Sequence, residues 1–209
     1  MYKIIFLIWI GVIANISFSA TQERELLSPD MQTSMHSSIL NPVTPHLVFN
    51  DQEQARVWLD DMSSRLKKWE PDEFLRKRYL TAIQYEAMRA DLDPQIILSI
   101  ITIESKFNKY AISPAGARGF MQVMPFWQTL IGAKEHNLLD VQTNLRYGCT
   151  ILRHYLQREN GNLIKALARY NGSVGKLWYP KLVMDAYNNY WKLYPVATLK
   201  DNKLTYLNY

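Results

Sequence analysis

Glu104 is the residue whose type and setting most clearly suggest chemistry. Three isoleucines stand seven, four and three residues before it, at Ile97, Ile100 and Ile101. In a helix this spacing places all three on the same face as the Glu104 carboxyl. Apolar neighbours hydrate a carboxylate poorly, which raises the pKa and favours the neutral acid, the form that donates a proton near neutral pH.

A purely structural role for Glu104 is also open at this point. Glutamates are seldom buried, and this one could lie at a frayed helix end, with its carboxylate in water or paired with Lys106 or Lys109. Periodicity alone does not choose between the two interpretations.

Other reaction chemistries find little support in the sequence. The four histidines do not show metal-ligand spacing, and H-E-x-x-H, G-x-S-x-G and glycine-rich phosphate-binding motifs are absent. We therefore expect no metal and no cofactor. The single cysteine, Cys149, cannot form an intramolecular disulfide, and its apolar helical setting indicates a packing residue and not a nucleophile.

The element that must position Glu104 has a marked beginning. Asp93 is a suitable N-cap and Pro94 suits the first helical position, so we expect a helix over residues 95–105. Its isoleucines would also suit a strand, but the cap and the length favour a helix. Because the segment is apolar nearly all round, the helix should be central and buried.

The flanking segments also show helical periodicity. Between residues 52 and 90, apolar side chains recur every three or four positions, which predicts two amphipathic helices separated near Pro71. Further helical patterns cover about 140–157, 162–170 and 180–191, and Gly172 is a C-cap signal. The expected fold class is mainly α, with little or no sheet.

Residues 51–194 are interpreted as one domain, with a C-terminal tail over 195–209. Residues 20–50 mix serine, threonine and three prolines with few large apolar groups, so they are expected to form a flexible leader. Residues 1–19 resemble a cleaved secretory signal peptide, since Lys3 precedes a short apolar stretch and small residues.

The signal segment bears on where the protein acts. Its apolar stretch, Ile4 to Ala14, is shorter than the roughly 20 residues that a membrane span needs. We therefore expect an exported, periplasmic or otherwise extracytoplasmic protein with no stable membrane anchor after cleavage; a retained anchor is the alternative. The net charge of +5 suits an anionic cell envelope, while clustered Lys and Arg typical of nucleic-acid binding are missing.

Three motifs in the second half of the chain carry a family resemblance. They are Glu104-Ser105-Lys106-Phe107, the stretch S-P-A-G-A-R-G-F-M-Q-V-M-P over 113–125, and Ala168-Arg169-Tyr170-Asn171-Gly172. In this order and apolar context they closely resemble the catalytic domain of soluble lytic transglycosylases, which is lysozyme-like and related in fold to goose-type lysozyme. The resemblance covers about residues 75–192. That family cleaves peptidoglycan between N-acetylmuramic acid and N-acetylglucosamine.

The resemblance implies a role for several residues. Glu104 is the catalytic residue, Ser113 lies near the scissile sugar, and Gln122 and Met124 line the substrate cleft. Gln122 stands between two methionines, and its amide needs partners such as sugar hydroxyls or N-acetyl groups. Met124 has core filling as an equal alternative.

The third motif contributes Tyr170 and Asn171 to the implied site. By the resemblance, the hydroxyl of Tyr170 approaches the catalytic acid, although the residue taken alone would be read as a core aromatic. Arg169 stands where the family often has alanine. Four more aromatics are candidates for sugar stacking, with core packing the favoured interpretation: Tyr110, Trp127, Trp178 and Tyr179.

The three motifs contain no second carboxylate. Glycosidases usually need two, but between Glu104 and Tyr170 the acidic residues are in polar contexts, at Glu135, Asp140 and Glu159. The resemblance implies a substrate-assisted route in which Glu104 acts twice, as acid and then as base, and releases a 1,6-anhydromuramyl product from the glycan strand.

Two other functions compete with this one. A goose-type-lysozyme-like hydrolase would deliver water to the same bond. A glycan-binding or secretion-assembly protein could have kept the cleft and lost activity, but the intact Glu104, Gln122 and Tyr170 argue against that loss. Association with other envelope proteins stays open.

Overall fold

The computed structural model describes residues 22, 26–40 and 43–193, so the expected signal peptide and the tail over 195–209 lie outside the described residues. The described chain is helical. Its elements are α1 (Pro29–Leu40), α2 (Gln52–Leu66), α3 (Glu73–Arg89), α4 (Pro94–Glu104), α5 (Phe126–Ile131), α6 (Val141–Arg158), α7 (Leu163–Asn171), α8 (Trp178–Ala186) and the π-helical turn η1 (Tyr187–Trp191).

The mainly α fold expected from the sequence is confirmed. Within the described residues, β-structure is limited to two isolated bridges, which join Ile112 to Arg118 and Arg118 to Val123 in the loop between α4 and α5. None of the helices in this part of the chain combines the length and the apolar character needed to cross a bilayer.

Capping residues that can be recognised in the sequence mark the ends of two helices. The Asp93 carboxylate accepts a hydrogen bond from the backbone N–H of Gln95 and caps α4, which starts at Pro94 as predicted. Gly172 ends α7 in the left-handed conformation, with φ of +77°. Two elements were not predicted from the sequence. They are the short helix α5 and the π-helical turn η1, which continues α8.

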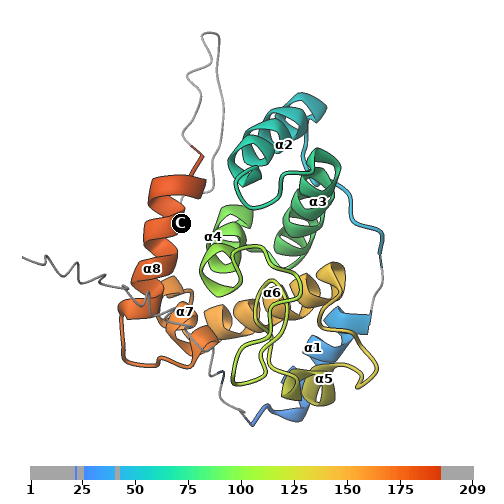
Figure 1. Ribbon diagram of the computed structural model, residues 1–209. Helices are drawn as coiled ribbons and strands as arrows, with labels where there is room; N and C mark the ends of the chain where they lie inside the picture. Colours follow the sequence, from blue (N-terminus) through green and yellow to red (C-terminus); the bar gives the residue numbers. More distant parts are fainter. Residues whose placement is uncertain (1–21, 23–25, 41–42, 194–209) are drawn as a thin grey trace, which may run out of the picture.

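The helix α4 lies at the centre of the domain, as its sequence predicts. It packs against α3 on one side and against α8 and η1 on the other, an arrangement visible in Figure 1. Every residue from Gln95 to Ile101 is buried. The helix α6 packs against α3 and α7 and completes the core. Its Cys149 is buried and free, which confirms the packing role, and burial raises the pKa of its thiol.

A buried ionic cluster joins α3 to α6. Glu86 is fully buried, and its carboxylate accepts hydrogen bonds from Arg146 at 2.9 Å and Arg89 at 2.7 Å. Arg89 also donates to the carbonyl of Ser38 in α1. Because a buried charge needs partners, this cluster fixes the relative positions of three helices.

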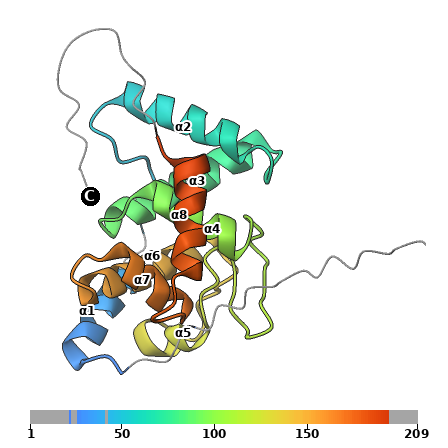
Figure 2. The same ribbon diagram turned by 90° about the vertical axis from the view of Figure 1, so that its left-hand side faces the viewer.

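The expectation of a flexible leader over residues 20–50 is wrong for its central part. Residues 29–40 form α1, which packs against α5 and α6 at the lower edge of the domain (Figures 1 and 2). Met35 and Ile39, one helical turn apart, are buried in the core. The polar composition conceals the helix, because two well-placed apolar residues and the bond from Arg89 are enough to dock it.

Residues 43–50 continue across the surface of the domain to α2. The side-chain amide of Gln84 in α3 makes two hydrogen bonds with Val48, one to its N–H and one to its carbonyl, each 2.8 Å long. Gln142 in α6 donates to the carbonyl of Val43. The described part of the N-terminal region is therefore attached to the domain at several points.

Candidate active site

Glu104 is the last residue of α4, and the chain turns sharply after it. The Ser105 hydroxyl donates to the carbonyl of Phe120 at 2.8 Å and so ties the helix end to the following loop. Lys106 and Phe107 then adopt positive φ angles of +51° and +62°, which are uncommon for residues other than glycine. The buried ring of Phe107 packs against an aromatic cluster and holds this turn in place.

The carboxyl group of Glu104 is held by Tyr179, the second residue of α8. The Tyr179 hydroxyl donates to Oε1 of Glu104 at 2.7 Å. Burial raises the pKa of Glu104 to about 8, and the hydrogen bond from Tyr179 lowers it by a smaller amount. The expectation of a poorly hydrated acid is confirmed, and the side chain keeps partial exposure through which a substrate can reach it.

Tyr179 itself stays protonated. Its ring is fully buried, and burial together with the neighbouring Glu104 charge raises its pKa well above the ordinary value for a phenol. The hydroxyl is therefore a fixed hydrogen-bond donor. Sequence analysis gave Tyr179 no part in the acid's environment, because it lies 75 residues from Glu104 and only tertiary packing brings the two together.

The motif tyrosine, Tyr170, has a different partner from the one that the resemblance implies. Its hydroxyl donates to the carbonyl of Met121 at 2.8 Å, while Tyr179 makes the hydrogen bond to Glu104. Burial and the Glu104 charge raise the pKa of Tyr170, so the phenol remains protonated near the acid. Asn171, the last residue of α7, is also buried.

Gln122 supports the loop between α4 and α5 from inside. The residue is buried, with a positive φ of +49°, and its side-chain Nε2 donates to the carbonyls of Gly119 at 2.9 Å and Ala111 at 3.2 Å. The amide needs partners, as expected, and in this structure its N–H groups find them in the backbone. The geometry therefore gives Gln122 a part in fixing the shape of the loop between α4 and α5.

Asn144 in α6 holds the same loop from the other side and was not identified from the sequence. Its Oδ1 accepts from the N–H of Met121 at 2.8 Å, and its Nδ2 donates to the carbonyls of Arg118 and Leu138. A Cβ at Gly119 would lie 2.5 Å from this amide, so only glycine fits there. No local pattern marks Asn144, because its partners lie in distant segments.

Ser113 and Met124 are the more accessible of the expected binding residues, both partly exposed. The Ser113 hydroxyl accepts from the N–H of Ala117 at 3.1 Å and closes a tight turn. Met124 packs against the edge of the core just before α5. Among the four additional aromatics, Trp127 and Tyr179 are buried, whereas Tyr110 and Trp178 are exposed.

The other acidic residues considered from the sequence have structural partners or lie on the surface. Glu159 forms an ion pair with Arg169, which accounts for the charge at that unusual motif position. Asp140 caps α6, and Glu135 is exposed. Within the described residues, His, Cys, Asp and Glu side chains do not gather in threes as a metal site would require.

Fold and site together define a class of protein: a helical domain that presents one protonated carboxyl group at the end of a central buried helix. The chain belongs to the family described as Transglycosylase SLT domain, whose sequence model matches residues 81–189, just over half of its length. The match contains α4, the loop to α5, and the helices α6 to α8.

Curated relatives agree with this family. The chain is similar to membrane-bound lytic murein transglycosylase F of Aliivibrio fischeri, 30% identical over 139 residues, covering 63% of this chain and 25% of the relative. The Vibrio cholerae protein of the same name is 24% identical over 152 residues, covering 70% of this chain and 26% of the relative. Membrane-bound lytic murein transglycosylase C of Actinobacillus pleuropneumoniae is 45% identical over 49 residues, covering 23% and 13%. The chain thus matches about a quarter or less of each relative's length.

Proposed function

We propose that this protein is an exported lytic transglycosylase that cleaves the β-1,4 bond between N-acetylmuramic acid and N-acetylglucosamine in peptidoglycan. One observation carries the proposal. The pKa of Glu104 is raised to about 8 by burial, so the carboxyl group holds a proton at neutral pH where a family of glycan-cleaving enzymes has its acid. The names of the curated relatives support murein as the substrate.

The geometry around Glu104 suits a proton donor. Tyr179 donates to Oε1, which leaves Oε2 to carry the transferable proton. In the first step Glu104 protonates the glycosidic oxygen and the bond from C1 to that oxygen breaks, while the substrate's own N-acetyl group stabilises the positive charge at C1. Proton donation of this kind typically accelerates reactions by about 10²- to 10⁴-fold.

In the second step the ionised Glu104 acts as a base. It takes the proton from the 6-hydroxyl of muramic acid, whose oxygen bonds to C1 and closes the 1,6-anhydro ring. Glu104 regains the proton that it gave, and no water is consumed. Tyr179 can donate its hydrogen bond to Glu104 in both steps. Its raised pKa keeps the phenol protonated whether Glu104 is neutral or ionised.

The remaining motif residues are assigned to substrate binding. Ser113 and Met124 are partly exposed and would contact the sugars directly. Gln122, Tyr170 and Asn171 are buried and would shape the cleft and supply polar groups to its floor. The partner is the peptidoglycan strand, and residues 1–19 would direct the chain to the periplasm or cell envelope.

A product analysis with Glu104→Gln tests the proposal. Wild-type protein should release from purified peptidoglycan muropeptides that are lighter by one water than hydrolysed ones, because the anhydro ring replaces addition of water. Glu104→Gln should reduce turnover by at least about 10³-fold, since the amide cannot donate the proton. Glu135→Gln, at an exposed carboxylate, is the matched control and should retain full activity.

Mass spectrometry separates the competing functions. Products heavier by one water would assign a lysozyme-like hydrolase. An absence of any product from folded wild-type protein would favour the non-catalytic binding protein. Near-normal turnover by Glu104→Gln would overturn the assignment of the acid.

A further inference from the structure

The connection between α7 and α8 presents apolar side chains to solvent. Val174 is 55% exposed, Leu177 is 69% exposed, and Trp178, the first residue of α8, is 38% exposed. The backbone just before them is held in place, because the N–H of the buried Ser173 donates to the carbonyl of Ala168 at 2.7 Å. Exposed apolar surface of this kind marks an interaction site in many proteins.

Two contacts join Trp178 to the acid of the candidate active site. Its ring meets the ring of Tyr179 edge to face, with 5.8 Å between the centroids and 83° between the planes. The hydroxyl of Tyr179 in turn donates to Glu104 at 2.7 Å. Because Tyr179 is fully buried and Trp178 is not, the pair of rings leads from the acid to the surface of the domain.

The exposed indole suits a sugar ring. An aromatic face packs against the C–H groups of a pyranose, while the sugar hydroxyls stay in water or find polar partners. We propose that Trp178 is a stacking platform for a sugar bound beside the scissile bond, and that Leu177 extends its apolar surface. The inference rests on the proposed function for its substrate. It makes Trp178 a residue that positions the glycan strand and takes no part in proton transfer.

An anionic membrane surface is the other occupant that this patch could suit, since Lys176 and Lys181 flank it. Lys181, however, pairs with Asp185 in α8 at 2.6 Å, which offsets one of the two positive charges. The contact with Tyr179 also places the indole next to the proposed acid. The glycan is therefore the better match.

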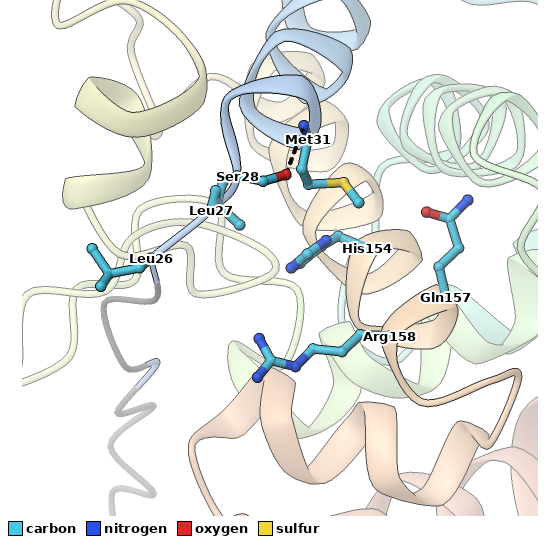
Figure 3. A pocket seen from close by; sticks show the side chains of 7 residues that line it. All are labelled: Leu26, Leu27, Ser28, Met31, His154, Gln157 and Arg158. Atoms are coloured by element: carbon cyan, nitrogen blue, oxygen red, sulfur yellow. Dashed lines mark hydrogen bonds between the residues drawn. The ribbon is translucent and has the colours of Figure 1, made fainter.

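A hollow elsewhere on the domain provides a control for the location of binding. It has a volume of about 350 Å³ and lies between residues 26–31 and α6. Figure 3 shows His154 and Gln157 extending from α6 at this hollow. The described residues that line it do not include Glu104 or Trp178. A variant at Gln157 therefore reports on binding that does not involve the proposed platform.

Binding measurements in the Glu104→Gln background test the inference without requiring turnover. The probe is the tetramer of β-1,4-linked N-acetylglucosamine, measured by isothermal titration calorimetry. Trp178→Ala should weaken its binding about tenfold, whereas Trp178→Phe, which keeps an aromatic ring, should weaken it about threefold or less. The matched control is Phe74→Ala, at an aromatic residue that is 68% exposed in the first turn of α3. Phe74→Ala and Gln157→Ala should leave the affinity unchanged, and the unfolding midpoint checks the folding of each variant.

Kinetics on soluble glycan strands separate a platform from an indirect effect through Tyr179. With Glu104 intact, Trp178→Ala should raise KM about tenfold and change kcat less than about twofold, because the platform binds the ground state and the transition state equally. The alkaline limb of the pH profile of kcat/KM should stay in place, since burial and Tyr179 set the pKa of Glu104. A moved limb together with a lower kcat would overturn the platform.

The possible outcomes separate this inference from the proposed function. Equal, measurable tetramer affinities with and without Trp178→Ala would overturn the platform while leaving the enzyme assignment intact. An equal loss with Phe74→Ala or Gln157→Ala would overturn it as well. Phosphatidylglycerol vesicles that bind the wild type and not Trp178→Ala, with tetramer affinity unchanged, would assign the surface to a membrane. Failure of every variant and of the parent protein to bind the tetramer would contradict both the inference and the proposed function.

Discussion

At the scale of single residues, burial and Tyr179 act on Glu104 in opposite directions. Burial favours the neutral acid, and the hydrogen bond from Tyr179 favours the ionised form. The effect of burial is the larger, so the acid stays protonated at neutral pH. The hydrogen bond from Tyr179 holds Oε1 at a fixed position. An acid that must give up a proton and take one back benefits from both effects.

Replacing Tyr179 with phenylalanine should separate these effects. The hydrogen bond lowers the pKa of Glu104, so its loss raises that pKa above about 8 and moves the alkaline limb of the kcat/KM profile to higher pH. We expect kcat to fall about tenfold as the carboxyl group loses its fixed orientation. The measurement is a pH–rate profile on soluble glycan strands.

Tyr187→Phe is a suitable control for Tyr179→Phe. Tyr187 makes a similar hydrogen bond to Asp93 at the opposite end of α4. Its replacement should leave the alkaline limb in place. An unmoved limb in Tyr179→Phe would show that Tyr179 does not position the acid.

The sequence predicts part of this site and not the rest, for a physical reason. The raised pKa of Glu104 follows from isoleucines within seven positions of it, because helical periodicity places them on its face. Tyr179 and Asn144 act across 75 and 23 residues of sequence, so no local pattern reveals their contacts. Gln122 was recognised as needing partners, but the backbone carbonyls that accept from it depend on the fold of the loop.

At the scale of secondary structure, α1 extends the domain beyond the region that the family model matches. Its buried residues Met35 and Ile39 contact the core, and Arg89 binds its last turn. The helix α1 therefore contributes to the stability of the domain.

Two neighbouring substitutions test the docking of α1. Ile39 is 3% exposed and Leu40 is 48% exposed. Ile39→Ala should lower the free energy of unfolding by about 2–4 kcal/mol, through lost burial and the cavity left behind. Leu40→Ala should change it by less than about 0.5 kcal/mol. Urea denaturation measures both values, and equally small effects would indicate that α1 does not pack as described.

The helices differ in how well their sequences predict them. The caps at Asp93 and Gly172 are local signals, so α4 and α7 were placed within one or two residues. The helix α1 was not predicted, because the average composition of residues 20–50 is polar. That average gives no weight to the spacing of Met35 and Ile39, the two residues that α1 buries. Trp191, the last residue of the π-helical turn η1, packs against Trp69 and Phe107, and these contacts between distant segments have no local signal in the sequence.

At the scale of the whole molecule, the buried acid links stability to pH. The pKa of Glu104 is about 8 in the folded protein against a reference value of 4.5. Between these values the folded state binds more protons than the unfolded state, so stability falls as pH rises from about 4.5 to about 8. The contribution of the neutral acid is complete below this window and lost above it.

Glu104→Gln should remove this pH dependence, because the amide stays neutral. One pKa unit corresponds to about 1.4 kcal/mol, so even half of the shift amounts to about 2 kcal/mol. We expect the variant to gain about that much unfolding free energy over wild type when the pH is raised from 5 to 8.5. Urea titrations of both proteins at the two pH values provide the test, and a constant difference between them would contradict the buried, neutral acid.

The docking of α1 also determines where a shortened version of this domain can begin. Met35 and Ile39 are buried in the core, and Arg89 donates to the carbonyl of Ser38. A fragment that starts at residue 81, where the match to the family model begins, would lack these contacts and would expose apolar surface of the core to water. Such a fragment should therefore aggregate more readily than the longer chain.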